Sequence, residues 1–126
     1  MHELGITEGI IERARSAARG AGGVRVLEVS LAITPAADFT RESIEMYFEM
    51  LTADDAFFRG ARIVWQELSA QATCLACGYE FEAREAHAPC PQCGSTQVRY
   101  AADSPMIQLR GVSIAEEGDE LEGGGA

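Results

Sequence analysis

The spacing of apolar residues along the chain predicts two amphipathic helices. In the stretch 6–19, apolar side chains recur on one helical face: Ile6, Ile10, Ala14 and Ala17 or Ala18. The glycine-rich run 20–23 is expected to end this helix. A second helix is predicted for 40–51, with Thr40 as a suitable N-cap. Its apolar positions are i, i+3, i+4 and i+7: Ile44, Tyr47, Phe48 and Leu51.

Alternating or β-branched stretches predict three strands. Residues 24–33 alternate, and one face is expected to hold Leu27, Val29, Leu31 and Ile33. The stretch 62–68 is rich in β-branched and aromatic residues, which favour strands. In 106–114 the alternation slips at Gly111, which suggests a β-bulge. We therefore predict an α+β fold, a small three-stranded sheet with two helices, into which a cysteine-rich module is inserted.

Composition narrows the class of protein. The chain has 126 residues and a net charge of −10, and all its basic residues are Arg. Such an acidic chain repels the phosphate backbone, so we expect no nucleic-acid partner. It contains no long apolar run, and its first residues include acids where a signal peptide would carry basic residues. We expect a cytoplasmic protein with no membrane partner.

All four cysteines lie in one segment, as two C-x-x-C-G units. The units contain Cys74, Cys77, Cys90 and Cys93, and twelve residues separate them. Each unit is a tight turn that aims two sulfur atoms at one point, and four thiolates complete the tetrahedral shell of a structural Zn²⁺. The segment is too small to build its own core, so metal must hold it folded. The sequence predicts an inserted zinc ribbon.

Other interpretations of the candidate chemistry stay open. Ligand spacing does not separate zinc from a rubredoxin-like iron site, and disulfides are a further alternative. His87, between the two units, is either a spare ligand or an exposed loop residue. The acid pairs at 54–55 and 116–117 are expected to be solvated surface. We find no catalytic constellation, so we predict that the chain is not an enzyme.

The N-terminus offers a second set of metal ligands. The amine of Met1, a peptide nitrogen and the imidazole of His2 lie within two residues, and nitrogen donors of this kind suit Ni(II) or Cu(II). We expect Met1 to be retained, because His2 is too bulky for aminopeptidase trimming. Many chains begin with Met-His by chance. We interpret this N-terminus as a metal site only because the chain also contains the cysteine cluster.

The Met1-His2-Glu3 start, together with a ribbon inserted before the last strand, resembles the HypA/HybF family of nickel metallochaperones for [NiFe]-hydrogenase. The resemblance covers about residues 1–115. It implies nickel on Met1, His2 and Glu3, and zinc on the four cysteines. It also implies delivery to the hydrogenase large subunit with a HypB-type GTPase, and in some members to urease maturation proteins. One departure is that the stretch 34–38 lacks the family's Gly-Glu-Leu-Ser turn, so a ligand role for Asp38 is left open.

From these features we predict three regions. A nickel-binding α/β domain comprises 1–69 and 104–115, a zinc-binding ribbon comprises 70–103, and 116–126 is a disordered tail rich in acids and glycine. An alternative function is a zinc-ribbon adaptor for proteins with no nickel role. A third is a small electron-transfer protein with iron in the cysteine site.

Overall fold

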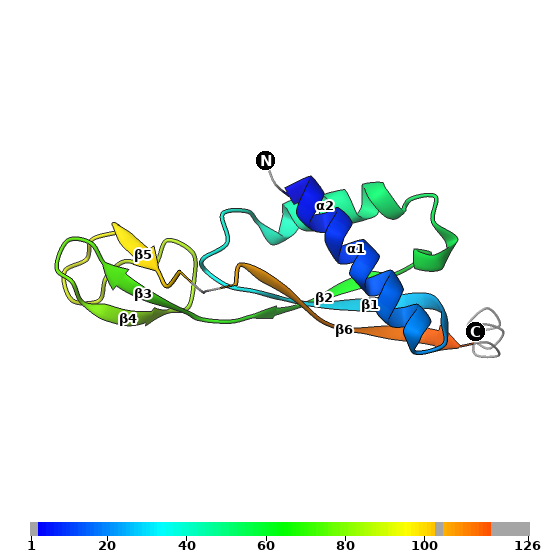
Figure 1. Ribbon diagram of the computed structural model, residues 1–126. Helices are drawn as coiled ribbons and strands as arrows, with labels where there is room; N and C mark the ends of the chain where they lie inside the picture. The colour runs from blue at the N-terminus through cyan, green and yellow to red at the C-terminus, as the bar shows by residue number, and fades with distance from the viewer. Residues whose placement is uncertain (1–2, 103–104, 117–126) are drawn as a thin grey trace. The chain divides into compact units, whose positions relative to one another are not determined.

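The chain folds into two compact units (Figure 1). The computed structural model describes residues 3–102 and 105–116. The first unit comprises Met1–Leu31, Phe39–Val64 and Leu109–Ala126, and the second comprises Ala32–Asp38 and Trp65–Gln108. The second unit therefore extends beyond the predicted 70–103 module at both ends.

Helix α1 (Glu3–Gly20) begins three residues earlier than predicted. Its buried side chains are Thr7, Ile10, Ile11, Ala14 and Ala18, which confirms most of the predicted face. The helix ends where the glycine-rich run begins, and Gly22 adopts a φ of +83° that favours glycine. No helix of the described residues is long and apolar enough to span a membrane.

Helix α2 (Arg41–Thr52) has the predicted N-cap, because the Thr40 side chain accepts a hydrogen bond of 3.1 Å from the backbone N–H of Ser43. It buries Ile44, Phe48 and Thr52. The short 3₁₀ helix η1 (Ala56–Phe58) follows, and Asp55 caps it.

Three strands form the first sheet, β1 (Gly23–Ile33), β2 (Arg62–Glu67) and β6 (Ile107–Glu116), in the order β2-β1-β6. Both helices lie on the same face of this sheet (Figure 1). The predicted face of β1 is wrong at its start, because Val26 is fully buried and Leu27 is 37% exposed. Burial resumes at Val29 and Leu31, so the alternation slips by one position, as at a β-bulge.

Strand β6 confirms the predicted slip around Gly111, since the less exposed positions are Ile107 and Leu109 before it and Val112 and Ile114 after it. It ends at Glu116, the first residue of the predicted tail, and 117–126 lie outside the described residues. At this same end of the sheet, Gly23 at the start of β1 allows a close approach to β6. A Cβ atom there would lie 2.9 Å from Cβ of Ile114 and 3.0 Å from the carbonyl oxygen of Ala18.

The second sheet belongs to the cysteine module and was not predicted. Its strands are β3 (Ala70–Cys74), β4 (Glu80–Ala83) and β5 (Val98–Tyr100), in the order β4-β3-β5. Both outer strands are antiparallel to β3, and Ala72 pairs with Phe81 on one side and Tyr100 on the other. Strands of three to five residues leave little alternation to detect. The two helices, the first sheet and the inserted cysteine module confirm the predicted fold class.

Candidate metal centre

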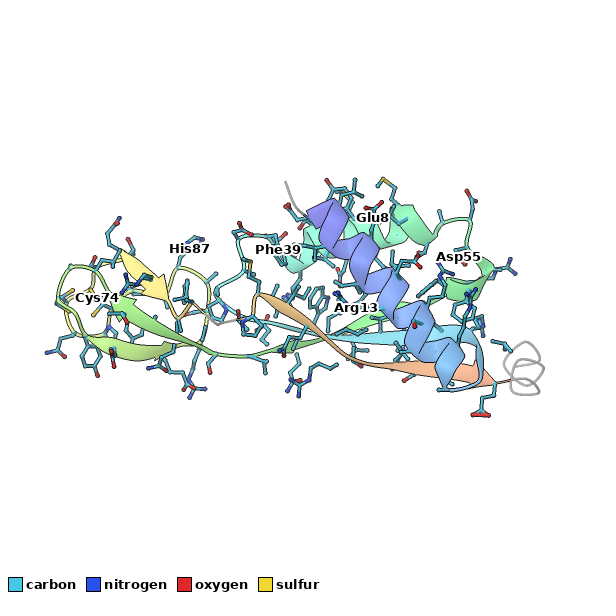
Figure 2. The ribbon with its side chains drawn as sticks, viewed as in Figure 1. Glu8, Arg13, Phe39, Asp55, Cys74 and His87 are labelled. Atoms are coloured by element: carbon cyan, nitrogen blue, oxygen red, sulfur yellow. The ribbon has the colours of Figure 1, made fainter. Side chains whose placement is uncertain are left out.

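The four cysteine sulfur atoms converge at one point of the second unit. The Sγ atoms of Cys74 and Cys93 are 3.6 Å apart, and those of Cys77 and Cys90 are 3.7 Å apart. All four lie within 4.8 Å of one another. Figure 2 shows Cys74 beside yellow sulfur atoms at the end of β3. Two turns separated by twelve residues of sequence therefore form one cluster.

These distances match a metal tetrahedron. Zinc–sulfur bonds of about 2.3 Å in a tetrahedron place neighbouring sulfur atoms about 3.8 Å apart, close to the two measured pairs. A disulfide needs a separation of about 2.05 Å, and all four cysteines are free. The donor set therefore fits a Zn²⁺ ion. Four thiolates leave no open coordination position, which is typical of a structural site.

The backbone conformation of each C-x-x-C-G turn depends on its glycine. Gly78 and Gly94 both have a φ of +80°, a conformation that side chains disfavour. Their N–H groups donate hydrogen bonds to the carbonyl oxygens of Cys74 and Cys90, at 2.9 and 2.8 Å. The two glycines thereby close the turns that the C-x-x-C-G pattern predicted.

Backbone N–H groups also point at the sulfur atoms. Those of Ala76 and Cys77 lie 3.3 and 3.4 Å from Sγ of Cys74, and that of Gln92 lies 3.3 Å from Sγ of Cys90. The N–H of Cys77, with that of Ala76, lowers the pKa of the Cys74 thiol to about 6 although burial opposes the shift. These N–H groups thus favour the thiolate form of Cys74, the form that a metal ligand requires. In the same turn, burial and the neighbouring thiols raise the pKa of Cys77.

The cluster has a buried and an exposed side. Cys74 and Cys90, the first cysteine of each turn, are 1% and 2% exposed, whereas Cys77 and Cys93 are exposed. His87 is exposed on the loop after β4, with a φ of +61° (Figure 2). It is not part of the sulfur cluster, so the position agrees with a loop residue.

The predicted nickel ligands lie at the edge of the described chain. Met1 and His2 fall outside the described residues. Glu3 is the first residue of α1, and its carbonyl oxygen accepts a hydrogen bond of 2.6 Å from the Thr7 hydroxyl. Asp38 is exposed on the loop between β1 and α2. The roles of these residues as nickel ligands stay predictions.

One charged cluster was missed by the sequence analysis. Asp55 was expected to be solvated, but it forms an ion pair of 2.8 Å with Arg15 and accepts a hydrogen bond from the backbone N–H of Phe57. The Arg15 guanidinium also lies 5.1 Å from the ring centre of Phe58. The hydrogen bond from Arg15 lowers the pKa of Asp55 below its ordinary value. Partners forty residues apart leave no local sequence signal.

Comparisons of sequence agree with this architecture. Residues 1–109 match the family model for HypA, described as a metallochaperone of hydrogenase and urease nickel incorporation. The hydrogenase maturation factor HypA of Geobacter metallireducens is 37% identical over 106 residues, which cover 84% of this chain and 93% of the relative. That of Chlorobium limicola is 32% identical over 119 residues, which cover 94% and 100%.

The fold also matches a solved structure. The solution structure of the Ni metallochaperone HypA from Helicobacter pylori has a TM-score of 0.62 at 15% identity, with 92% of this chain and 99% of that chain covered. The matches confirm the resemblance inferred from the sequence. They also confirm the prediction that the chain is not an enzyme, because the matched family is one of metallochaperones.

Proposed function

Because the chain belongs to the HypA family of hydrogenase and urease nickel metallochaperones, we propose that it binds Ni(II) at its N-terminus and delivers the ion to the [NiFe]-hydrogenase large subunit. The ligands in this proposal are the amine and backbone of Met1 and His2, the His2 imidazole and the Glu3 carboxylate. Zn²⁺ on Cys74, Cys77, Cys90 and Cys93 has a structural role.

The observation that supports this proposal is that the four cysteines fill the coordination shell of their own metal. Among residues 3–102 and 105–116, the four cysteines are the one group of three or more metal-ligating side chains that come together. Four sulfurs leave no position for a cargo ion. A nickel site therefore needs ligands from outside this group, and the first two residues supply nitrogen donors suited to Ni(II).

Ligands of this kind also allow release. The reference pKa of an α-amine is about 8 and that of an imidazole about 6.5, so protons compete with nickel near neutral pH. Acidification from pH 8 to 6 is expected to weaken nickel binding strongly. Zinc bound by four thiolates in a closed cluster should stay in place over the same interval. Cargo and structural metal would thus differ in their response to pH.

The proposed partners are a HypB-type GTPase and the hydrogenase large subunit, and urease maturation proteins where the cell makes urease. This work would take place in the cytoplasm. The family description names both hydrogenase and urease nickel incorporation, and the curated relatives are hydrogenase maturation factors. Nickel content of hydrogenase and urease, purified from cells with and without His2→Ala, would identify the recipient.

A nickel titration by calorimetry tests the site. The samples are the zinc-loaded protein with a free Met1 amine, His2→Ala, and a form with one residue added before Met1. His87→Ala is the matched control, because the chain has only two histidines. We expect one nickel to bind the native protein and His87→Ala, and both N-terminal variants to lose it. Equal binding by all four forms would exclude the terminus, and no binding by any form would favour the adaptor function.

A further inference from the structure

The outer face of α2 carries a strip of exposed apolar side chains. Met46 and Met50 are 56% and 57% exposed, and their spacing of four residues places them on adjacent turns of one face. Each follows a buried residue, Ile44 or Phe48, by two positions, which is roughly 200° around the helix. Both methionines therefore face away from the core of the first unit.

Negative charge borders this strip. Glu42 and Glu49 of α2 are exposed, and Asp54 is exposed directly beyond the helix. The last turn of α2 contains no basic residue, so no side chain there offsets the negative end of the helix dipole. This surface attracts cations and repels anionic lipids and nucleic acids.

A groove opens beside the C-terminal half of α2, with a cavity volume of about 540 Å³. The buried rings of Phe48 and Phe58 line it and meet edge to face, with their centres 6.0 Å apart. Glu49, Asp54 and Arg59 also line it. Two exposed carboxylates, Glu49 and Asp54, outnumber the one cation, Arg59, so the lining suits the charged end of a long cationic side chain.

We propose that the outer face of α2 and this groove form a docking surface for a basic, amphipathic helix of a partner protein. Met46 and Met50 would receive its apolar face, since methionine adapts to varied partners. Glu42 and Glu49 would pair with its flanking cations, and the groove would hold one of them. The surface lies apart from the proposed nickel ligands in sequence, and it does not depend on nickel binding.

Two designed helical peptides of equal length test the proposal. They share one leucine face, flanked by Arg in the first peptide and by Glu in the second, and each is titrated into the full-length, zinc-loaded protein. We expect the Arg peptide to bind and the Glu peptide not to bind. Met46→Gln with Met50→Gln should weaken binding about tenfold or more. Glu42→Gln with Glu49→Gln should also weaken it and reduce its salt dependence.

Matched variants on the second unit serve as controls. Met106→Gln changes another exposed methionine, and Glu80→Gln with Glu85→Gln removes two exposed acids. Both should leave the dissociation constant within about twofold of the wild type. Circular dichroism would check that each variant is folded, and glutamine is a good helix former.

Several results would overturn the proposal: no binding of the Arg peptide, equal binding of the two peptides, or no effect of the paired methionine substitutions. A dimer that the methionine substitutions dissociate in sedimentation experiments would instead assign the surface to a second copy of the chain. Nickel titration of the methionine variant should match that of the wild type. A failure of this proposal is therefore distinguishable from a failure of the nickel site.

Discussion

The first unit buries large branched and aromatic side chains, whereas the cysteine module (residues 70–102) buries small residues and sulfur. Buried residues of the first unit include Ile10, Val26, Leu31, Ile44, Phe48 and Phe58. The apolar residues buried in the module are Ala70, Ala72, Cys74, Ala83 and Cys90. Alanine removes little apolar area from water, and stabilisation scales with that area. From this comparison we expect the first unit to fold through its apolar core and the cysteine module to need its metal.

The largest predicted effect follows from breaking the metal site. Cys90→Ser removes one buried ligand, and the module should lose zinc and its three-stranded sheet because little else supports them. The first unit should keep its helices. Zinc content and an amide NMR spectrum would measure both effects, with Ser95→Ala as a control in the same segment. If Cys90→Ser keeps its zinc and the cysteine module keeps its dispersed amide resonances, the module does not need a complete metal site to fold.

The opposite experiment weakens the first unit and spares the module. Phe48→Ala removes a ring that is 4% exposed and contacts Phe58. Truncating a buried Phe costs about 3–5 kcal/mol, so the unfolding midpoint of the helical unit should fall. Zinc content should not change. Denaturation followed by helical circular dichroism gives the stability, and Tyr79→Ala in the module should leave that transition in place.

A smaller but sharper test concerns Gly23. Gly23→Ala would place a Cβ atom 2.9 Å from Cβ of Ile114 and 3.0 Å from a backbone oxygen. Overpacking of this kind costs about 1–3 kcal/mol. Gly111→Ala, whose Cβ would meet nothing within 4 Å, is the control on the same sheet. Equal melting temperatures for the two variants would show that the close approach at Gly23 is relaxed.

The smallest effect is expected at the Arg15–Asp55 ion pair. Asp55→Asn should cost about 1 kcal/mol at pH 7, as for a single partly buried interaction. The pKa of Asp55 is lowered in the folded state, so its contribution exists above its unfolded pKa of about 3.9 and is lost as pH falls through the folded pKa. Wild type and variant should therefore converge in acid. Asp54→Asn, which removes a neighbouring exposed carboxylate, is the matched control and should leave the stability at pH 7 unchanged.

Local features were predictable from the sequence, and long-range ones were not. The C-x-x-C-G turns require glycine at fixed positions, so the cysteine cluster follows from spacing alone. Thr40 caps α2 through a neighbour three residues away. By contrast, the slip in β1 that buries Val26 leaves no signal in the alternation of its residues. Likewise, Asp55 acquires its role only when the fold brings it to Arg15.

The uneven burial of the four cysteines determines which of their sulfur atoms a chelator or an oxidant can reach. Each turn hides its first sulfur and presents its second, so a chelator or an oxidant reaches Cys77 and Cys93 first. These two residues come from different turns, and removing either one leaves the metal with three sulfur ligands and an open coordination position. The lifetime of the ribbon in an oxidising or zinc-poor medium is therefore governed by its two outward thiolates, whereas Cys74 and Cys90 are shielded until the metal has begun to leave.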